Sequence, residues 1–102
     1  MMKGKQPYNL LWRPRAESDL NTIIDYIAQD NPIRAKSFGQ ELRDKIRSLS
    51  QFPELGRKGR PGLPNWLYEL VLHKHYIVFY HIVRETRSVE ILRIKHVSQQ
   101  IP

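Results

Sequence analysis

The 102-residue sequence predicts an α+β fold in which a helical hairpin packs on one face of a small, mainly antiparallel sheet, in the order β-α-α-β-β-β. Two stretches with helical apolar spacing are joined too tightly for a strand between them. Three short apolar stretches with strand-like alternation follow in the second half, and one precedes the helices. Because both helices fall between the first strand and the other three, we expect them to cover the same face of one sheet.

The first strand is expected at residues 8–13, where Pro14 ends it. The first helix is expected from about Pro14 to Asp30. Apolar side chains recur along it with the i, i+3, i+4, i+7, i+8 spacing of one helix face. These residues are Leu20, Ile23, Ile24, Ile27 and Ala28. The spacing predicts an amphipathic helix with one buried side.

The pair Asn31-Pro32 ends this helix and begins another. Asn is a good N-cap, and Pro suits the first helical position. We expect the second helix to reach about Phe52. Its buried face should hold Ala35, Phe38, Leu42, Ile46 and Leu49. The short connection between the helices predicts an antiparallel hairpin.

Residues 53–65, PELGRKGRPGLPN, contain three Gly and three Pro and predict a basic loop. Three strands are expected after it, at residues 66–73, 76–84 and 88–97. The turns between them span only a few residues, which predicts an antiparallel meander.

Length and composition predict one domain, with a flexible N-terminal leader at residues 1–7 and a single folded domain at 8–102. The chain has no cysteine, which excludes disulfides, thiolate nucleophiles and cysteine zinc sites. It has no apolar run near the N-terminus long enough for a signal peptide or a membrane span, so we expect a cytoplasmic protein without a membrane partner. The net charge of +7, concentrated in residues 57–102, favours an anionic partner such as nucleic acid or an acidic protein. A basic surface that only aids solubility is the alternative.

Residues 73–82, HKHYIVFYHI, hold three of the four histidines. Strand alternation places Tyr76, Val78, Tyr80 and Ile82 on one face and Ile77, Phe79 and the neighbouring histidines on the other. Apolar residues on both faces predict a central strand that the helices cover on one side and a partner partly covers on the other. His73 and His75 lie in a turn, His81 lies about 20 Å further along the strand, and no carboxylate completes a ligand set. We therefore expect neither a metal site nor a cofactor.

His96 ends the last predicted strand, where an imidazole can act as a general acid or base near neutral pH. Arg93 and Lys95 lie beside it in the sequence and can stabilise charge on a phosphate. The alternative is an exposed or hydrogen-bonded histidine at a strand end.

Several motifs recur in an order that resembles the ParE/RelE toxin superfamily of bacterial toxin–antitoxin modules. They are Ala16-Glu-Ser-Asp-Leu20, Tyr26-Ile27, Ala35-x-x-Phe38, Leu49-x-x-Phe-Pro53-x-x-Gly56-Arg57, Tyr76-x-Val-x-Tyr80 and Val89-Glu-Ile-Leu-Arg-Ile-Lys-His96-x-x-Gln99. The resemblance spans nearly the whole chain. It implies a toxin of a type II module that an acidic antitoxin wraps and neutralises, in a hetero-oligomer.

The superfamily resemblance implies two alternative activities. RelE-like members are ribosome-dependent mRNA endonucleases, whereas ParE-like members poison DNA gyrase without established nuclease residues. RelE-like sequences tend to carry Arg directly after the first Tyr of the Tyr-x-x-x-Tyr segment, where this chain has Ile77. An aliphatic side chain cannot contact a phosphate, and the His-x-x-Gln ending is also ParE-like. The resemblance therefore favours gyrase inhibition, with an association with plasmid stabilisation.

Each activity implies its own site. Candidate contacts with the target or the antitoxin are Arg57, Lys58, Arg60, Tyr76, Tyr80 and Gln99. If the chain is instead a ribosome-dependent ribonuclease, the resemblance assigns proton transfer to His96. Arg60, Arg93 and Lys95 would then stabilise the phosphate.

Overall fold

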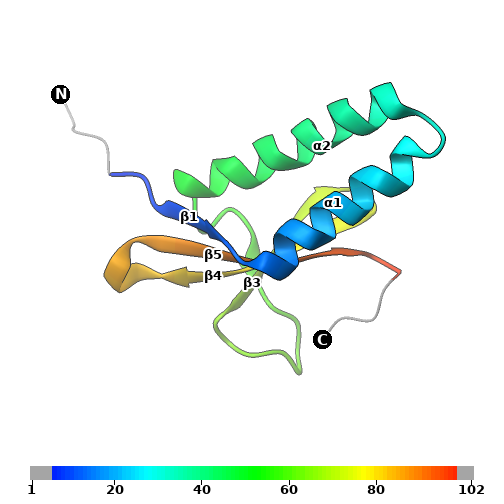
Figure 1. Ribbon diagram of the computed structural model, residues 1–102. Coiled ribbons are helices and arrows are strands. Elements are labelled where there is room, and N and C mark those ends of the chain that lie inside the picture. The colour runs from blue at the N-terminus through cyan, green and yellow to red at the C-terminus, as the bar shows by residue number, and fades with distance from the viewer. Residues whose placement is uncertain (1–5, 99–102) are drawn as a thin grey trace.

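Two helices lie side by side across one face of a five-stranded sheet in the computed structural model, which describes residues 6–98 (Figure 1). Along the chain the elements are β1 (Asn9–Trp12), α1 (Pro14–Ala28), α2 (Pro32–Arg47), a 3-10 turn η1 (Ser48–Ser50), β2 (Arg57–Lys58), β3 (Leu67–His73), β4 (Tyr76–Val83), a 3-10 turn η2 (Arg84–Thr86) and β5 (Ser88–His96). The predicted fold class is confirmed. No helix within these residues is long and apolar enough to cross a membrane.

The helix starts follow the sequence signals. α1 begins at Pro14, and α2 begins at Pro32, where the Asn31 side chain accepts a hydrogen bond from the backbone N–H of Arg34 at 3.0 Å. α2 stops at Arg47, earlier than expected. Ser50 explains the change, since its backbone and hydroxyl oxygens both bond to the backbone of Tyr8 and tie the chain to the start of β1.

The strand order in the sheet is β1-β5-β4-β3-β2. β1 runs parallel to β5, with Asn9 opposite Ser88, and every other pair is antiparallel. β2 was not predicted: Arg57 and Lys58, inside the expected loop, pair with Glu69 and Tyr68 of β3. Two residues are too short to carry a periodic pattern, so only the tertiary structure reveals this strand.

The apolar core is divided between the two faces of the sheet. The larger cluster lies under the helices and includes Leu20, Leu42 and Tyr80. A smaller cluster of Leu67, Ile77 and Phe79, with Leu63 and Leu92 packed against it, lies on the face opposite the helices, called the second face below. The predicted alternation along β4 is therefore correct. Leu63 of the chain's own loop supplies part of the cover on the second face, which the sequence did not predict.

Candidate functional site

The basic loop is attached to the second face by one buried carboxylate. Glu69 of β3 is 2% exposed, and its oxygens lie 2.9 Å from the Arg57 guanidinium and 3.2 Å from that of Arg60. The Arg57 side chain itself remains 73% exposed. One carboxylate cannot neutralise two guanidiniums, so a surplus positive charge remains at the surface, beside exposed Lys58.

The buried side chain of Tyr80 holds the turn at Pro53–Gly56, which precedes the basic residues of the loop. Its hydroxyl donates to the carbonyl of Pro53 at 2.8 Å and accepts from the N–H of Gly56 at 3.0 Å. Burial raises the pKa of this phenol to about 12. Gly56 is required here, because a Cβ at this position would lie 2.3 Å from the carbonyl oxygen of Glu69. Tyr80 is completely buried, so its side chain offers no surface to a partner, contrary to its place among the expected contact residues.

Arg93 is engaged with α1 rather than free for a phosphate. Its guanidinium donates two hydrogen bonds to Asp19, at 2.8 and 3.0 Å, and this bonding raises the arginine's pKa further. Asp19 also accepts from the backbone N–H of Ile94 at 2.9 Å. That N–H lies on β5 beyond Ile91, the last residue paired with β1, so the carboxylate satisfies an otherwise open sheet edge.

The other nuclease candidates do not converge. Lys95 and His96 are consecutive on β5, opposite Ile77 and Tyr76 respectively, and their side chains therefore point to different faces. Arg60 is paired with Glu69, as described. The structure thus pairs Arg60 with a carboxylate and directs Lys95 and His96 to opposite faces of the sheet.

A histidine cluster that the sequence did not predict lies at one end of the sheet. The rings of His75 and His96 stack with centroids 5.5 Å apart, and His73 lies 6.3 Å from His75. The register of β4 with β5, which places Tyr76 opposite His96, brings the last histidine to the first two. Within residues 6–98, no group of three or more His, Asp or Glu side chains is arranged to hold a metal ion.

The remaining candidate contacts differ in accessibility. Tyr76 is half-buried against Phe38 of α2, with ring centroids 5.7 Å apart, and burial raises the pKa of its phenol. Gln99 lies outside the described residues, as do the first five residues of the expected leader.

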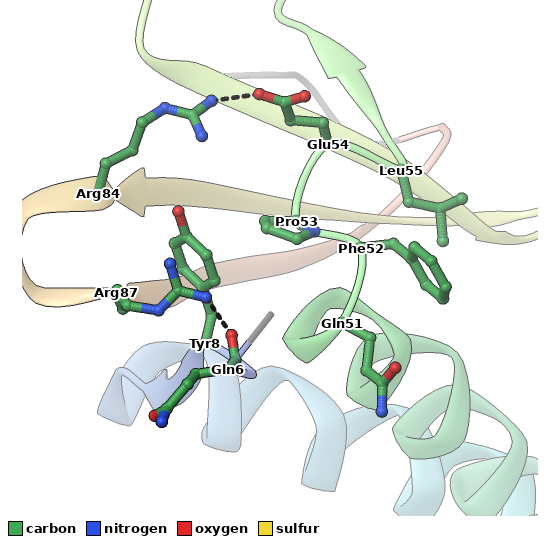
Figure 2. Close-up of a pocket in the computed structure, with 9 residues that line it drawn as sticks. All are labelled: Gln6, Tyr8, Gln51, Phe52, Pro53, Glu54, Leu55, Arg84 and Arg87. Carbon is green, nitrogen blue, oxygen red and sulfur yellow. Dashed lines mark hydrogen bonds and ion pairs between the residues drawn. The ribbon is translucent and has the colours of Figure 1, made fainter. Parts of the chain in front are cut away.

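Two pockets contain residues that sequence reasoning missed. The larger, of about 820 Å³, is lined by Gln6, Tyr8, Gln51, Phe52, Pro53, Glu54, Leu55, Arg84 and Arg87. Figure 2 shows Arg84 pointing toward Glu54 and Arg87 toward the backbone oxygen of Gln6, with Phe52 and Leu55 on the side away from both arginines. Both guanidiniums thus already have partners.

The smaller pocket, of about 280 Å³, lies on the second face and is lined by Pro64, Trp66, Leu67, Phe79, Leu92 and Arg93. Trp66 is 49% exposed and packs on the ring of His81, with centroids 4.8 Å apart. The sequence feature that could have indicated this pocket is Trp66, two residues after Pro64. A tryptophan at this place is equally consistent with the start of the expected strand.

Comparisons with known proteins agree with this fold. A family profile described as ParE toxin of type II toxin-antitoxin system, parDE, matches residues 10–101. Toxin RelE2 of Caulobacter vibrioides is 33% identical over 90 residues, which cover 88% of this chain and 96% of that protein.

Solved structures of two toxin–antitoxin systems have the same fold. A chain of the chromosomal ParDE system from P. aeruginosa matches with a TM-score of 0.76 and 24% identity, over 92% of this chain and 100% of that one. A chain of the intact E. coli RelBE complex matches with a TM-score of 0.61 and 16% identity, over 90% and 99%. At these identities the likeness concerns the fold alone.

Proposed function

The chain belongs to the ParE toxin family of type II toxin–antitoxin systems, and from this premise we propose that it inhibits DNA gyrase and is neutralised by a cognate acidic antitoxin. The ParE-like branch is the one that the sequence resemblance favours. We further propose that the protein acts in the cytoplasm and contributes to plasmid stabilisation.

The observation that carries this proposal is the apolar character of the second face around Ile77. Ile77 is 4% exposed and packs with Leu67 and Phe79, where RelE-like sequences tend to have a phosphate-binding arginine. A nuclease site needs preorganised charge aimed at the scissile phosphate. Because Arg93 is bound to Asp19 and the side chains of Lys95 and His96 point to different faces, this arrangement supports an activity that requires no catalytic residue.

The proposed contacts with gyrase are the exposed basic residues of the loop, with Gln99 and the half-buried Tyr76 as further candidates. Arg57 and Arg60 also hold the loop to Glu69, so reversing their charge would place carboxylates against a buried carboxylate. Lys58 is exposed and takes part in no ion pair found within residues 6–98. A change at Lys58 therefore alters the contact surface without breaking an ion pair that holds the loop to the sheet.

Plasmid supercoiling by purified gyrase tests the proposal. We expect the protein to abolish supercoiling, or to trap cleaved DNA, at near-stoichiometric amounts. Lys58→Glu should weaken this inhibition, while the matched change Lys36→Glu, at an exposed position of α2, should not. Full supercoiling in the presence of folded wild-type protein would overturn the proposal.

The second candidate is a ribosome-dependent mRNA endonuclease, favoured by the relative named toxin RelE2 and by the presence of Arg93, Lys95 and His96 on β5. In this case the wild-type protein cleaves mRNA in a translating extract, and His96→Gln abolishes cleavage while the fold persists. Cleavage that is undiminished in His96→Gln would exclude His96 as the catalyst.

A further inference from the structure

We propose that the pocket beside Trp66 anchors one large apolar side chain of an acidic polypeptide segment. Identifying that segment with the antitoxin rests on the function proposed above. The volume of this pocket, about 280 Å³, falls just below the range of about 300–1,000 Å³ that holds whole drug-sized ligands. This size suits a side chain rather than a small-molecule substrate.

The pocket wall rests on the central strand of the sheet. Trp66 packs on His81 of β4, with ring centroids 4.8 Å apart, and β4 is paired on both sides. Leu67 and Phe79 form the floor and are 8% and 2% exposed. A half-exposed tryptophan on a fixed support is the kind of residue that dominates binding energy at protein interfaces, because little side-chain entropy remains to be lost.

The lining favours an apolar side chain over a nucleobase. Arg93 supplies the one charged group, and its guanidinium already donates two hydrogen bonds to Asp19. A base in this pocket would leave its polar edge without partners, which costs binding free energy. An aliphatic or aromatic side chain has no such edge to satisfy.

The rim determines the charge of the partner. Glu69 lies opposite Phe79 of the pocket floor, so the guanidiniums of Arg57 and Arg60 that it holds lie beside the pocket. These two arginines share one carboxylate, and Lys95 lies on the next row of the second face, opposite Ile77. A segment that places carboxylates on either side of its apolar residue complements this surface.

Nuclear magnetic resonance of the two tryptophan indoles tests the proposal directly. The probe is a capped synthetic pentapeptide, Asp-Glu-Leu-Glu-Asp, titrated into the ¹⁵N-labelled protein. We expect the Trp66 indole signal to shift, while that of Trp12, which packs under Arg43 on the other side of the sheet, stays in place. Peptides with Gly for Leu, or with Lys for every acidic residue, should bind at least about tenfold more weakly, as loss of an anchor or of charge complementarity requires.

A matched pair of variants locates the site. Leu92→Glu places a carboxylate at the pocket and should weaken binding of the acidic peptide at least about tenfold. Ile33→Glu makes the same chemical change at the 85% exposed start of α2 and should leave binding unchanged. Amide spectra of both variants establish that the fold is retained. If Leu92→Glu fails to fold, titration of the wild-type protein with the Gly and Lys peptides still shows whether the site needs an apolar anchor and acidic neighbours.

The outcomes separate this inference from the proposed function, because the titration does not involve gyrase. Equal binding of the Leu and Gly peptides, an unshifted Trp66 signal, or a Trp66 shift with oligothymidylate instead of peptide would overturn the anchor pocket. If the Trp66 signal shifts selectively but the protein fails to inhibit gyrase, the anchor pocket is supported and only the gyrase proposal is rejected.

Discussion

At the scale of single residues, the hydroxyl of Tyr80 joins two parts of the chain that the strands alone do not hold together. It links β4 to the turn at Pro53 and Gly56, which leads into the basic loop. The sequence places Tyr80 correctly on the helix-facing side of its strand, since alternation is a local property. It cannot show which backbone groups the hydroxyl meets, because those lie more than twenty residues away.

Removal of this hydroxyl should loosen the turn. We expect Tyr80→Phe to lower the free energy of unfolding by about 1–3 kcal/mol, because the Pro53 carbonyl and the Gly56 N–H lose a buried partner. Urea denaturation measures the change. Tyr26→Phe, at a 68% exposed tyrosine, is the control and should be neutral. Equal stability of Tyr80→Phe and the wild type would show that the bond contributes nothing.

The pKa of the same phenol predicts a pH dependence. The folded state raises the Tyr80 pKa from 10.0 to about 12, so the folded protein retains a proton that the unfolded chain releases. This contribution to stability is fully present below pH 10 and is lost as the pH rises from 10 toward about 12. We expect denaturation midpoints to fall across this window, and to fall less in Tyr80→Phe. If the denaturation midpoints of the wild type and Tyr80→Phe fell equally as the pH rose, the assignment of this pH dependence to Tyr80 would be wrong.

Asp19 is the second residue whose role only the tertiary structure reveals. In the sequence Asp19 is only one polar residue of the Ala16–Leu20 motif, whereas in the structure its side chain bonds Arg93 and the edge N–H of Ile94. Asp19→Ala should cost about 1.5–3 kcal/mol, the range for hydrogen bonds to charged groups. Asp25→Ala, at an exposed position of the same helix, should change stability by less than about 0.5 kcal/mol. Thermal unfolding compares the pair, and equal losses would refute the special role of Asp19.

At the scale of elements, long periodic segments were predictable and the short strand was not. α1, α2 and the three strands β3, β4 and β5 fall within a few residues of their expected bounds, because periods of 3.6 and 2 are repeated often enough to be recognised. β2 pairs with β3 next to Glu69, whose carboxylate bonds both Arg57 and Arg60, and we attribute the strand to this contact. In the sequence, Glu69 resembles an ordinary polar residue of a half-exposed strand.

Glu69→Gln tests this view of β2. The amide preserves the shape but removes the charge that holds both arginines, so we expect a loss of about 1–3 kcal/mol and faster tryptic cleavage within the loop. Glu41→Gln breaks an exposed ion pair with Arg34 and should cost at most about 1 kcal/mol. An unchanged cleavage rate in Glu69→Gln would mean that the backbone pairing of β2 suffices to hold the loop.

At the scale of the whole molecule, the net charge of +7 acts on encounters more than on the fold. Association with an acidic partner should slow by about tenfold or more between about 0.05 and about 0.5 M salt, because screening shortens the reach of the field. Dissociation should change less. Stopped-flow mixing with the acidic antitoxin proposed above measures both rates, and a salt-independent association rate would contradict electrostatic steering.

The family and the layer arrangement were also predictable at this scale, whereas the distribution of functional groups was not. The sequence lists Arg60, Arg93, Lys95 and His96 as one potential site, since all four carry suitable chemistry. The structure pairs Arg60 with Glu69 and Arg93 with Asp19, and it directs His96 away from Lys95. Such partnerships join residues far apart in the chain and leave no periodic trace.

The parallel pairing of β1 with β5 has a consequence for the newborn chain. Residues 9–12 find their neighbour only at residues 88–91, and β5 lies between β1 and β4 in the finished sheet. During translation the first strand therefore stays without its partner strand until residues 88–91 have been made. A premature stop before residue 88 removes an interior strand and leaves β1 without a partner. A product that stops there therefore cannot form the five-stranded sheet, so the fold of this toxin depends on residues made after both of its helices.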